Sequence, residues 1–103
     1  MSIKKVVREG KVAVLVSHGY GAGWSTWVDN RTEQSLFDPE IVEWVEKGKP
    51  GIDLDDKFGH YGYLGGLPDV EIEWVPEGSR FIVDEYDGAE SLTIINPDYG
   101  YVA

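Results

Sequence analysis

Residues 70–95 read VEIEWVPEGSRFIVDEYDGAESLTII, and this stretch decides the fold. Apolar and acidic residues alternate from Val70 to Trp74, which is the spacing of side chains on the two faces of a β-strand. Pro76-Glu77-Gly78-Ser79 and Asp87-Gly88 carry the residues that favour tight turns. The stretch therefore predicts antiparallel strands from residue 70, at 81–86 and at 91–95, before a turn at Asn96-Pro97-Asp98.

A second hairpin is expected near the amino terminus, over residues 3–17. Valines at 12, 14 and 16 alternate with Lys11, Ala13 and Leu15, and 3–7 is a weaker strand. Glu9-Gly10 supplies the turn between them, because glycine tolerates a positive φ.

Residues 38–48, DPEIVEWVEKG, carry the clearest helical pattern. Asp38 can cap the amino terminus, and Pro39 suits the first helical position, where no N–H is needed. Gly48 can take the left-handed conformation that ends a helix. We predict a helix at 39–47, with one or two further helical turns at 52–58. The expected architecture is a single α+β domain over residues 1–103, an antiparallel sheet of about five strands with the 39–47 helix packed on one face.

The charge of the chain is strongly negative and unevenly distributed. Nine Lys and Arg stand against nineteen Asp and Glu, a net charge of −10 over 103 residues. Four of the nine bases fall within the first eleven residues beside one acid, which leaves a net of −13 from residue 12 onward. Such a chain repels nucleic acid and anionic membranes and attracts basic partners. We expect no direct nucleic-acid or membrane binding, and the oligomeric state stays undetermined.

Cysteine is absent, which excludes disulfides, thiolate catalysis and cysteine-ligated metal centres. No apolar run approaches the ~20 residues that a membrane-spanning helix needs. An acidic chain without cysteine or a signal peptide is expected in the cytoplasm.

Two loops combine glycine with aromatic residues: 17–27 reads SHGYGAGWSTW and 59–66 reads GHYGYLGG. Closely spaced glycines let main-chain N–H groups converge on an anion. The lysine of a phosphate-binding loop and the third glycine of the dinucleotide fingerprint are absent. Either the loops form two walls of a cleft for a nucleotide, a sugar or a partner, or their aromatic residues close the core over the sheet edge. The candidate contact residues are His18, Tyr20, Trp24, Ser25, Thr26, Trp27, Tyr61 and Tyr63.

The chain holds no complete catalytic or metal-binding set. Residues 14–23 resemble the strand and His-Gly-x-Gly turn of the oxyanion hole in α/β-hydrolases, but no Gly-x-Ser-x-Gly nucleophile motif follows. His18 and His60 are the only histidines, and nothing in the sequence brings them together. The acidic runs 53–56 and 84–87 lack the glycine and glutamate of an EF-hand loop. We therefore predict no catalytic residue, no metal and no cofactor.

An acidic surface is expected around the carboxyl-terminal hairpins. Glu71 and Glu73 share one face of their strand, and like charges across a sheet cost stability. The surface is either a docking face for a basic groove or an ordinary solvated outer face. Its members are Glu71, Glu73, Glu77, Asp84, Glu85, Asp87 and Glu90.

Several segments together resemble a family of small acidic bacteriophage and prophage proteins to which no activity is assigned. The segments are VAVLV at 12–16, GAGWSTW at 21–27, LFDPEIVE at 36–43, EIEWVPEGSRF at 71–81 and EYDG at 85–88. The resemblance implies a phage context, in which small acidic proteins often inhibit host or defence factors, as anti-CRISPR proteins and nucleic-acid mimics do. Our leading hypothesis is a non-enzymatic inhibitor that docks on a basic surface of such a factor in the host cytoplasm. The alternative is a small-ligand binding module built on the loop at 18–27.

Overall fold

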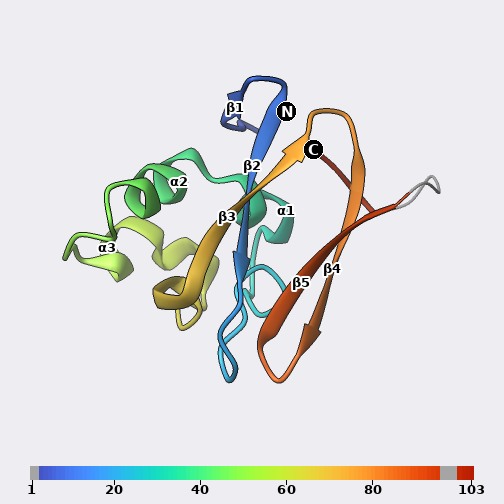
Figure 1. The fold of residues 1–103 in the computed structure, drawn as a ribbon. Helices are drawn as coiled ribbons and strands as arrows, with labels where there is room; N and C mark the ends of the chain where they lie inside the picture. The colour runs from blue at the N-terminus through green and yellow to red at the C-terminus, as the bar shows by residue number, and fades with distance from the viewer. Residues whose placement is uncertain (1–2, 96–99) are drawn as a thin grey trace.

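The computed structural model describes residues 3–95 and 100–103, and the predicted turn at Asn96-Pro97-Asp98 lies outside them. Six strands, three α-helices and two short 3-10 helices follow one another along the chain (Figure 1). In chain order they are β1 Val7–Arg8, β2 Lys11–Ser17, α1 Thr32–Phe37, α2 Pro39–Glu46, α3 Leu54–Phe58, η1 Gly59–Tyr61, η2 Leu67–Asp69, β3 Val70–Pro76, β4 Arg80–Tyr86, β5 Ala89–Ile95 and β6 Tyr101–Val102.

The predicted α+β class and its antiparallel strands are confirmed, but the strands form two sheets rather than one. One sheet has the order β1-β2-β3 and the other the order β5-β4-β6. Every pairing is antiparallel, with Val14 opposite Glu73 in the first sheet and Asp84 opposite Ser91 in the second. β5 pairs with the whole length of β4, and β6 pairs with Arg80 and Phe81 on its other edge, so β4 and β3 belong to different sheets.

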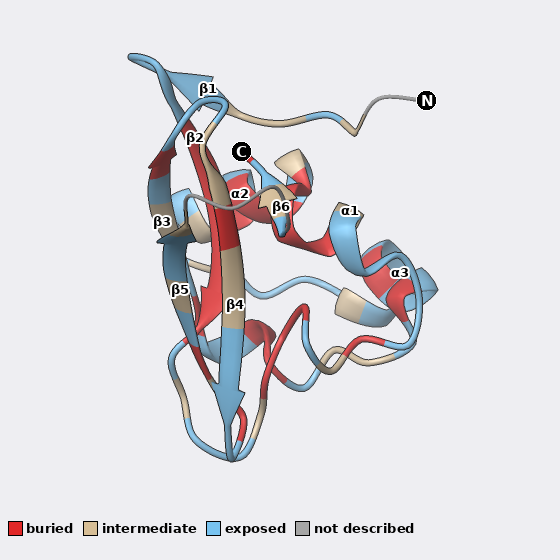
Figure 2. Cartoon of the chain, turned by 90° about the vertical axis from the view of Figure 1, so that its right-hand side faces the viewer, coloured by how far each residue is buried: buried red, intermediate tan, exposed pale blue. Residues whose placement is uncertain are grey.

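The strand β2 runs through the centre of the molecule and is buried on both faces (Figure 2). Ala13 and Leu15 belong to a core cluster shared with α2 and the 58–70 segment. Val12, Val14 and Val16 belong to a second cluster, which includes residues of α1, β3 and β4. A strand covered on both faces needs an unbroken apolar run, and VAVLV at 12–16 supplies one.

The helix predicted at 39–47 is present as α2 and ends one residue earlier, at Glu46. Its cap forms as expected, because the Asp38 carboxylate accepts the N–H of Glu40 at 2.9 Å. Gly48 has a φ of 83° just past the end. Helix α3 confirms the helical turns expected within 52–58.

The sequence did not indicate α1, because Arg31 at its start is left-handed and supplies no side-chain cap. The strand expected at 3–7 is shorter than predicted: only Val7–Arg8 pairs with β2. The Glu9-Gly10 turn is confirmed, with positive φ at both residues.

Candidate functional site

The glycine-rich loop after β2 folds around a buried carboxylate. Glu90, on β5, is 2% exposed, and one of its oxygens accepts the Ser17 N–H at 2.9 Å. The other oxygen accepts the N–H groups of Trp24 and Thr26 at 2.8 and 3.0 Å, and the Thr26 hydroxyl at 2.6 Å. Main-chain N–H groups of this segment therefore converge on an anion, as the glycines suggest, but the anion is a side chain of the same protein.

The expectation that Glu90 belongs to an exposed acidic face is wrong. Glu90 shares a face of β5 with Leu92, which packs against the core, whereas Ser91 and Thr93 on the other face are exposed. The same period of two that groups Glu71 with Glu73 thus places Glu90 on an inward face. A carboxylate on such a face must be hydrogen-bonded, and this pattern is the sequence signal for its structural role.

The two glycine-rich loops adjoin, and much of their contact is buried aromatic surface. Trp24 and Tyr61 are fully buried and meet edge to face, with ring centroids 5.3 Å apart. The Trp24 indole N–H donates to the Ser35 carbonyl at 2.8 Å, and the Tyr61 hydroxyl donates to Asp38 at 2.6 Å. Ser25 is also buried. Trp24, Ser25 and Tyr61 are therefore parts of the core and not walls of an open ligand cleft.

The remaining loop candidates lie at or near the surface. Tyr20 is 77% exposed, and His18 and Thr26 are exposed as well. Trp27 and Tyr63 are half-buried and pack on each other, with ring centroids 5.6 Å apart. The backbones of the two loops also touch: a Cβ added to Gly66 would lie 2.1 Å from the carbonyl oxygen of Gly23. At that point the loops leave no space between them for a ligand.

β2 ends, β3 begins and the β4–β5 hairpin turns at the same end of the molecule (Figure 1), and each of these segments carries acidic residues. The hairpin tip is held there because the Gly21 N–H donates to the Asp87 carbonyl. Gly19 lies against the Asp69 carboxylate, which ties the start of β3 to the same loop. We call this region the acidic end and define it by Asp69, Glu71, Glu73, Glu85 and Asp87. All five are exposed except Glu73, which is half-buried.

One histidine lies among these carboxylates. The His18 Nε2 atom is 3.5 Å from an oxygen of Glu73 and 3.8 Å from an oxygen of Glu71. That Glu73 oxygen, Oε2, is buried and has no hydrogen-bond partner. Among the described residues, no Lys or Arg side chain lies within 4 Å of a carboxylate of the acidic end. The acidic end therefore keeps most of its negative charge.

Two other predicted members of the acidic face lie elsewhere. Asp84 is exposed on the face of β4 opposite to that of Glu85, near the acidic end but pointing away from the first sheet. Glu77 lies at the far end of the molecule, where its N–H donates to the Gly10 carbonyl in the β1–β2 turn. The expectation that Glu77 belongs to the same acidic surface as Glu71 is therefore wrong.

The Lys and Arg side chains that form ion pairs do so away from the acidic end. Arg8 forms a two-pronged ion pair with Glu46, and this guanidinium lowers the pKa of the Glu46 carboxyl. Lys47 pairs with Glu43 one helical turn away at 2.6 Å and lowers the pKa of Glu43. Arg8 and Lys11 thus lie at the opposite end of β2 from the acidic end, and Arg8 is already paired there with Glu46.

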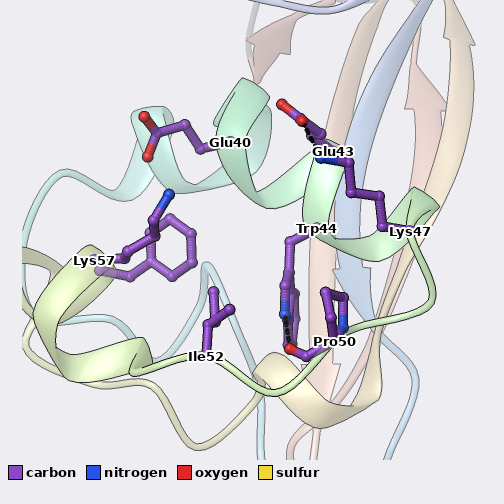
Figure 3. A pocket seen from close by; sticks show the side chains of 8 residues that line it. Glu40, Glu43, Trp44, Lys47, Pro50, Ile52 and Lys57 are labelled. Carbon is purple, nitrogen blue, oxygen red and sulfur yellow. Dashed lines mark hydrogen bonds and ion pairs between the residues drawn. The ribbon is translucent and has the colours of Figure 1, made fainter.

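A shallow hollow between α2 and α3 encloses about 200 Å³ (Figure 3). Trp44 and Phe58 form its apolar floor, and the Trp44 indole N–H is already bonded to the Pro50 carbonyl at 2.9 Å. Two glutamates and two lysines surround it, so its charges balance. The hollow is smaller than the ~300–1,000 Å³ of typical ligand pockets.

Within residues 3–95 and 100–103, no group of three His, Asp or Glu side chains is placed to hold a metal ion. Within the same ranges, no helix combines the length and apolar character needed to cross a membrane. Comparison of the whole chain with protein-family models, curated proteins and solved structures gave no significant match.

Proposed function

We propose that this protein is a non-enzymatic binding protein whose acidic end docks on a basic surface of another protein. The observation that carries the proposal is the gathering of carboxylates at one end of β2, where no Lys or Arg of the described residues pairs with them. Five carboxylates lie around this end, with the His18 imidazole beside two of them, and Arg8 and Lys11 lie at the other end. Such a distribution speeds association with a cationic surface and repels nucleic acid.

The partner surface that fits best is one that itself binds nucleic acid. Such surfaces present Lys and Arg side chains to phosphate groups, and carboxylates can occupy the same places. The resemblance of segment 21–27 to phage proteins supports a host or defence factor as the target, met in the host cytoplasm. Binding of this kind blocks the target's access to its nucleic acid.

The acidic end is held in one geometry before any partner arrives. The Glu85 carboxylate accepts the Gly88 N–H at 2.6 Å, and Asp87 is tied to Gly21 through the backbone. Glu90 fixes the loop behind them. Groups that are already ordered lose less conformational entropy on binding, which favours affinity.

Affinity capture from nuclease-treated bacterial lysate tests the proposal, with two variants that each remove three negative charges. One variant is Glu71→Gln, Glu85→Gln and Asp87→Asn, in the acidic end. The matched control is Glu33→Gln, Asp55→Asn and Glu77→Gln, three exposed carboxylates elsewhere.

We expect the wild-type protein and the control to retain the same partner at low ionic strength, and the acidic-end variant to lose it. The partner should elute as salt rises, because exposed charges are screened beyond ~8–10 Å. Equal retention by the two variants, or retention unchanged at high salt, contradicts the proposal. The small-ligand alternative has less support, since Trp24, Ser25 and Tyr61 are buried.

A further inference from the structure

β3 is an edge strand with one unpaired side. β2 pairs with β3 along its full length, from Lys11 opposite Pro76 to Ser17 opposite Val70. Among the described residues, no other strand pairs with β3 and no loop backbone bonds to residues 70–75 from the far side. An edge of this kind is a template for an added strand.

The register shows which peptide groups point outward from that edge. The Glu77 N–H donates to the Gly10 carbonyl. Glu77 and Gly10 continue the register of β3 and β2, so they form a hydrogen-bonded pair of this antiparallel ladder. In an antiparallel ladder such pairs alternate with pairs whose N–H and C=O groups point away from the partner. Glu73 and Glu71 therefore bond inward to β2, and the peptide groups of Ile72 and Trp74 face outward.

The side chains along this edge alternate in chemistry as well. Glu71 and Glu73 lie on one face of the sheet, and Ile72 and Trp74 lie on the other. The buried oxygen of Glu73 lacks a hydrogen-bond donor. Trp74 is 37% exposed, with the Arg8 guanidinium 5.6 Å from its ring centroid, so part of its apolar surface is available beside the same edge.

A second copy of this chain is a poor occupant of the edge. Antiparallel pairing of two β3 strands centred on Ile72 places Glu71 of each copy directly opposite Glu73 of the other. Like charges directly opposite each other destabilise a sheet, and each copy carries a net charge of −10. Charge complementarity instead favours a cationic strand.

We propose that the β3 edge binds an extended segment of the partner in which Lys or Arg alternates with apolar residues. Residues opposite one another across a ladder share a face. The cations therefore lie against Glu71 and Glu73, and the apolar side chains lie against Ile72 and Trp74. Pro76 has no N–H to offer, so the segment pairs with β3 between Val70 and Trp74. The inference rests on the proposed function and specifies how the basic partner is held.

Capped octapeptides of alternating Lys and Val test this geometry by fluorescence anisotropy at low salt. When the peptide runs antiparallel to β3 and its Val residues lie opposite Ile72 and Trp74, the Val amides point into the new ladder and the Lys amides point to solvent. N-methylation of the Val amides should weaken binding about tenfold or more, because several hydrogen bonds are lost. N-methylation of the Lys amides, the matched control, should change the affinity by about twofold or less.

A variant pair tests the charge requirement with the unmodified peptide. Glu71→Gln with Glu73→Gln should weaken its binding, and Glu77→Gln should not. A block peptide of four Lys followed by four Val has the same composition and should bind more weakly than the alternating one.

The edge proposal is overturned if methylation of Val and of Lys has the same effect, or if the block peptide binds equally well. Binding of the alternating peptide that survives the double glutamine change also overturns it. These results leave the acidic end as a docking surface intact if the lysate partner is still lost by the acidic-end variant. If the acidic-end variant also retains the lysate partner as well as its control does, both proposals are contradicted.

Discussion

The carboxylate of Glu90 accepts a hydrogen bond from the backbone N–H of Trp24 at 2.8 Å, although the two residues are 66 positions apart. This contact joins the second sheet to the loop that follows β2. The Glu90 carboxylate occupies the point where the main-chain N–H groups of the glycine-rich loop converge. The same contact positions the β4–β5 turn beside this loop. The acidic end therefore depends on one buried acid that is not itself part of the surface.

Replacing Glu90 should destabilise the fold and loosen the loop. Glu90→Ala removes the acceptor of three backbone N–H groups and one hydroxyl, and we expect a loss of about 2–4 kcal/mol in the free energy of unfolding. Urea denaturation monitored by tryptophan fluorescence measures it. Asp84→Ala, on the exposed face of the same hairpin, is the control and should change stability by less than about 0.5 kcal/mol. Equal effects of the two changes contradict the role of Glu90.

Tyr61→Phe should cost about 1–3 kcal/mol, because it deletes the buried donor to the Asp38 carboxylate and leaves that oxygen unpaired. Thermal or urea unfolding at pH 7 gives the value. Tyr20→Phe, at an exposed position, should be neutral. A neutral Tyr61→Phe would mean that the hydrogen bond adds nothing to stability.

Alkaline pH should weaken the wild-type fold more than the Tyr61→Phe variant. Burial, with the hydrogen bond to Asp38 in second place, raises the pKa of Tyr61 far above its ordinary value. The unfolded chain therefore releases this proton above pH ~10 while the folded protein keeps it, so stability present below that pH is lost as pH rises. The slope from this residue is at most about 1.4 kcal/mol per pH unit. Parallel stability curves for the two proteins between pH 9 and pH 11, measured by urea denaturation, would contradict this linkage.

Gly66→Ala should be destabilising by about 1–3 kcal/mol, because the added methyl meets the Gly23 backbone where the two loops touch. Gly59→Ala is the matched control: its Cβ meets nothing within 4 Å and its φ is −57°. That change should be neutral or stabilising by up to about 1 kcal/mol. Calorimetric unfolding of both variants decides whether the loops are packed as described.

Backbone amide exchange should alternate along β3 in the free protein. The N–H groups of Glu71, Glu73 and Val75 bond to β2 and should exchange slowly. Those of Ile72 and Trp74 face the open edge and should exchange faster by about tenfold or more. Residue-resolved exchange by NMR reads the pattern directly. Uniform protection from 71 to 75 would mean that the edge is already covered.

Local features of the fold follow from local sequence. The Asp38 cap, Pro39 and Gly48 mark both ends of α2, because these residues act within a single helical turn. The Glu9-Gly10 turn and the strands after residue 70 follow from turn chemistry and a period of two. Helix α1 lacks such signals, and its Leu36 and Phe37 are held by packing in the core that they share with β2.

Some features of the candidate site also follow from the sequence, whereas others depend on the tertiary structure. Its net charge and the pairing of Glu71 with Glu73 on one face are properties of the sequence. The separation of Glu77 from the acidic end, and the identity of the donors that Glu90 meets, required the tertiary structure. So did the burial of Trp24 and Tyr61, since their partners Ser35 and Asp38 come from distant segments.

Composition and short-range spacing by themselves determined an acidic α+β protein with antiparallel hairpins and a capped central helix. Only the tertiary structure decided that the strands divide between two sheets, that the glycine-rich loop closes on Glu90, and that β3 is left as an open edge. The physical reason is the sequence separation over which each effect acts. Capping and strand alternation depend on residues only a few positions apart. Burial and strand pairing depend on which distant segments compete for the same edge or the same face.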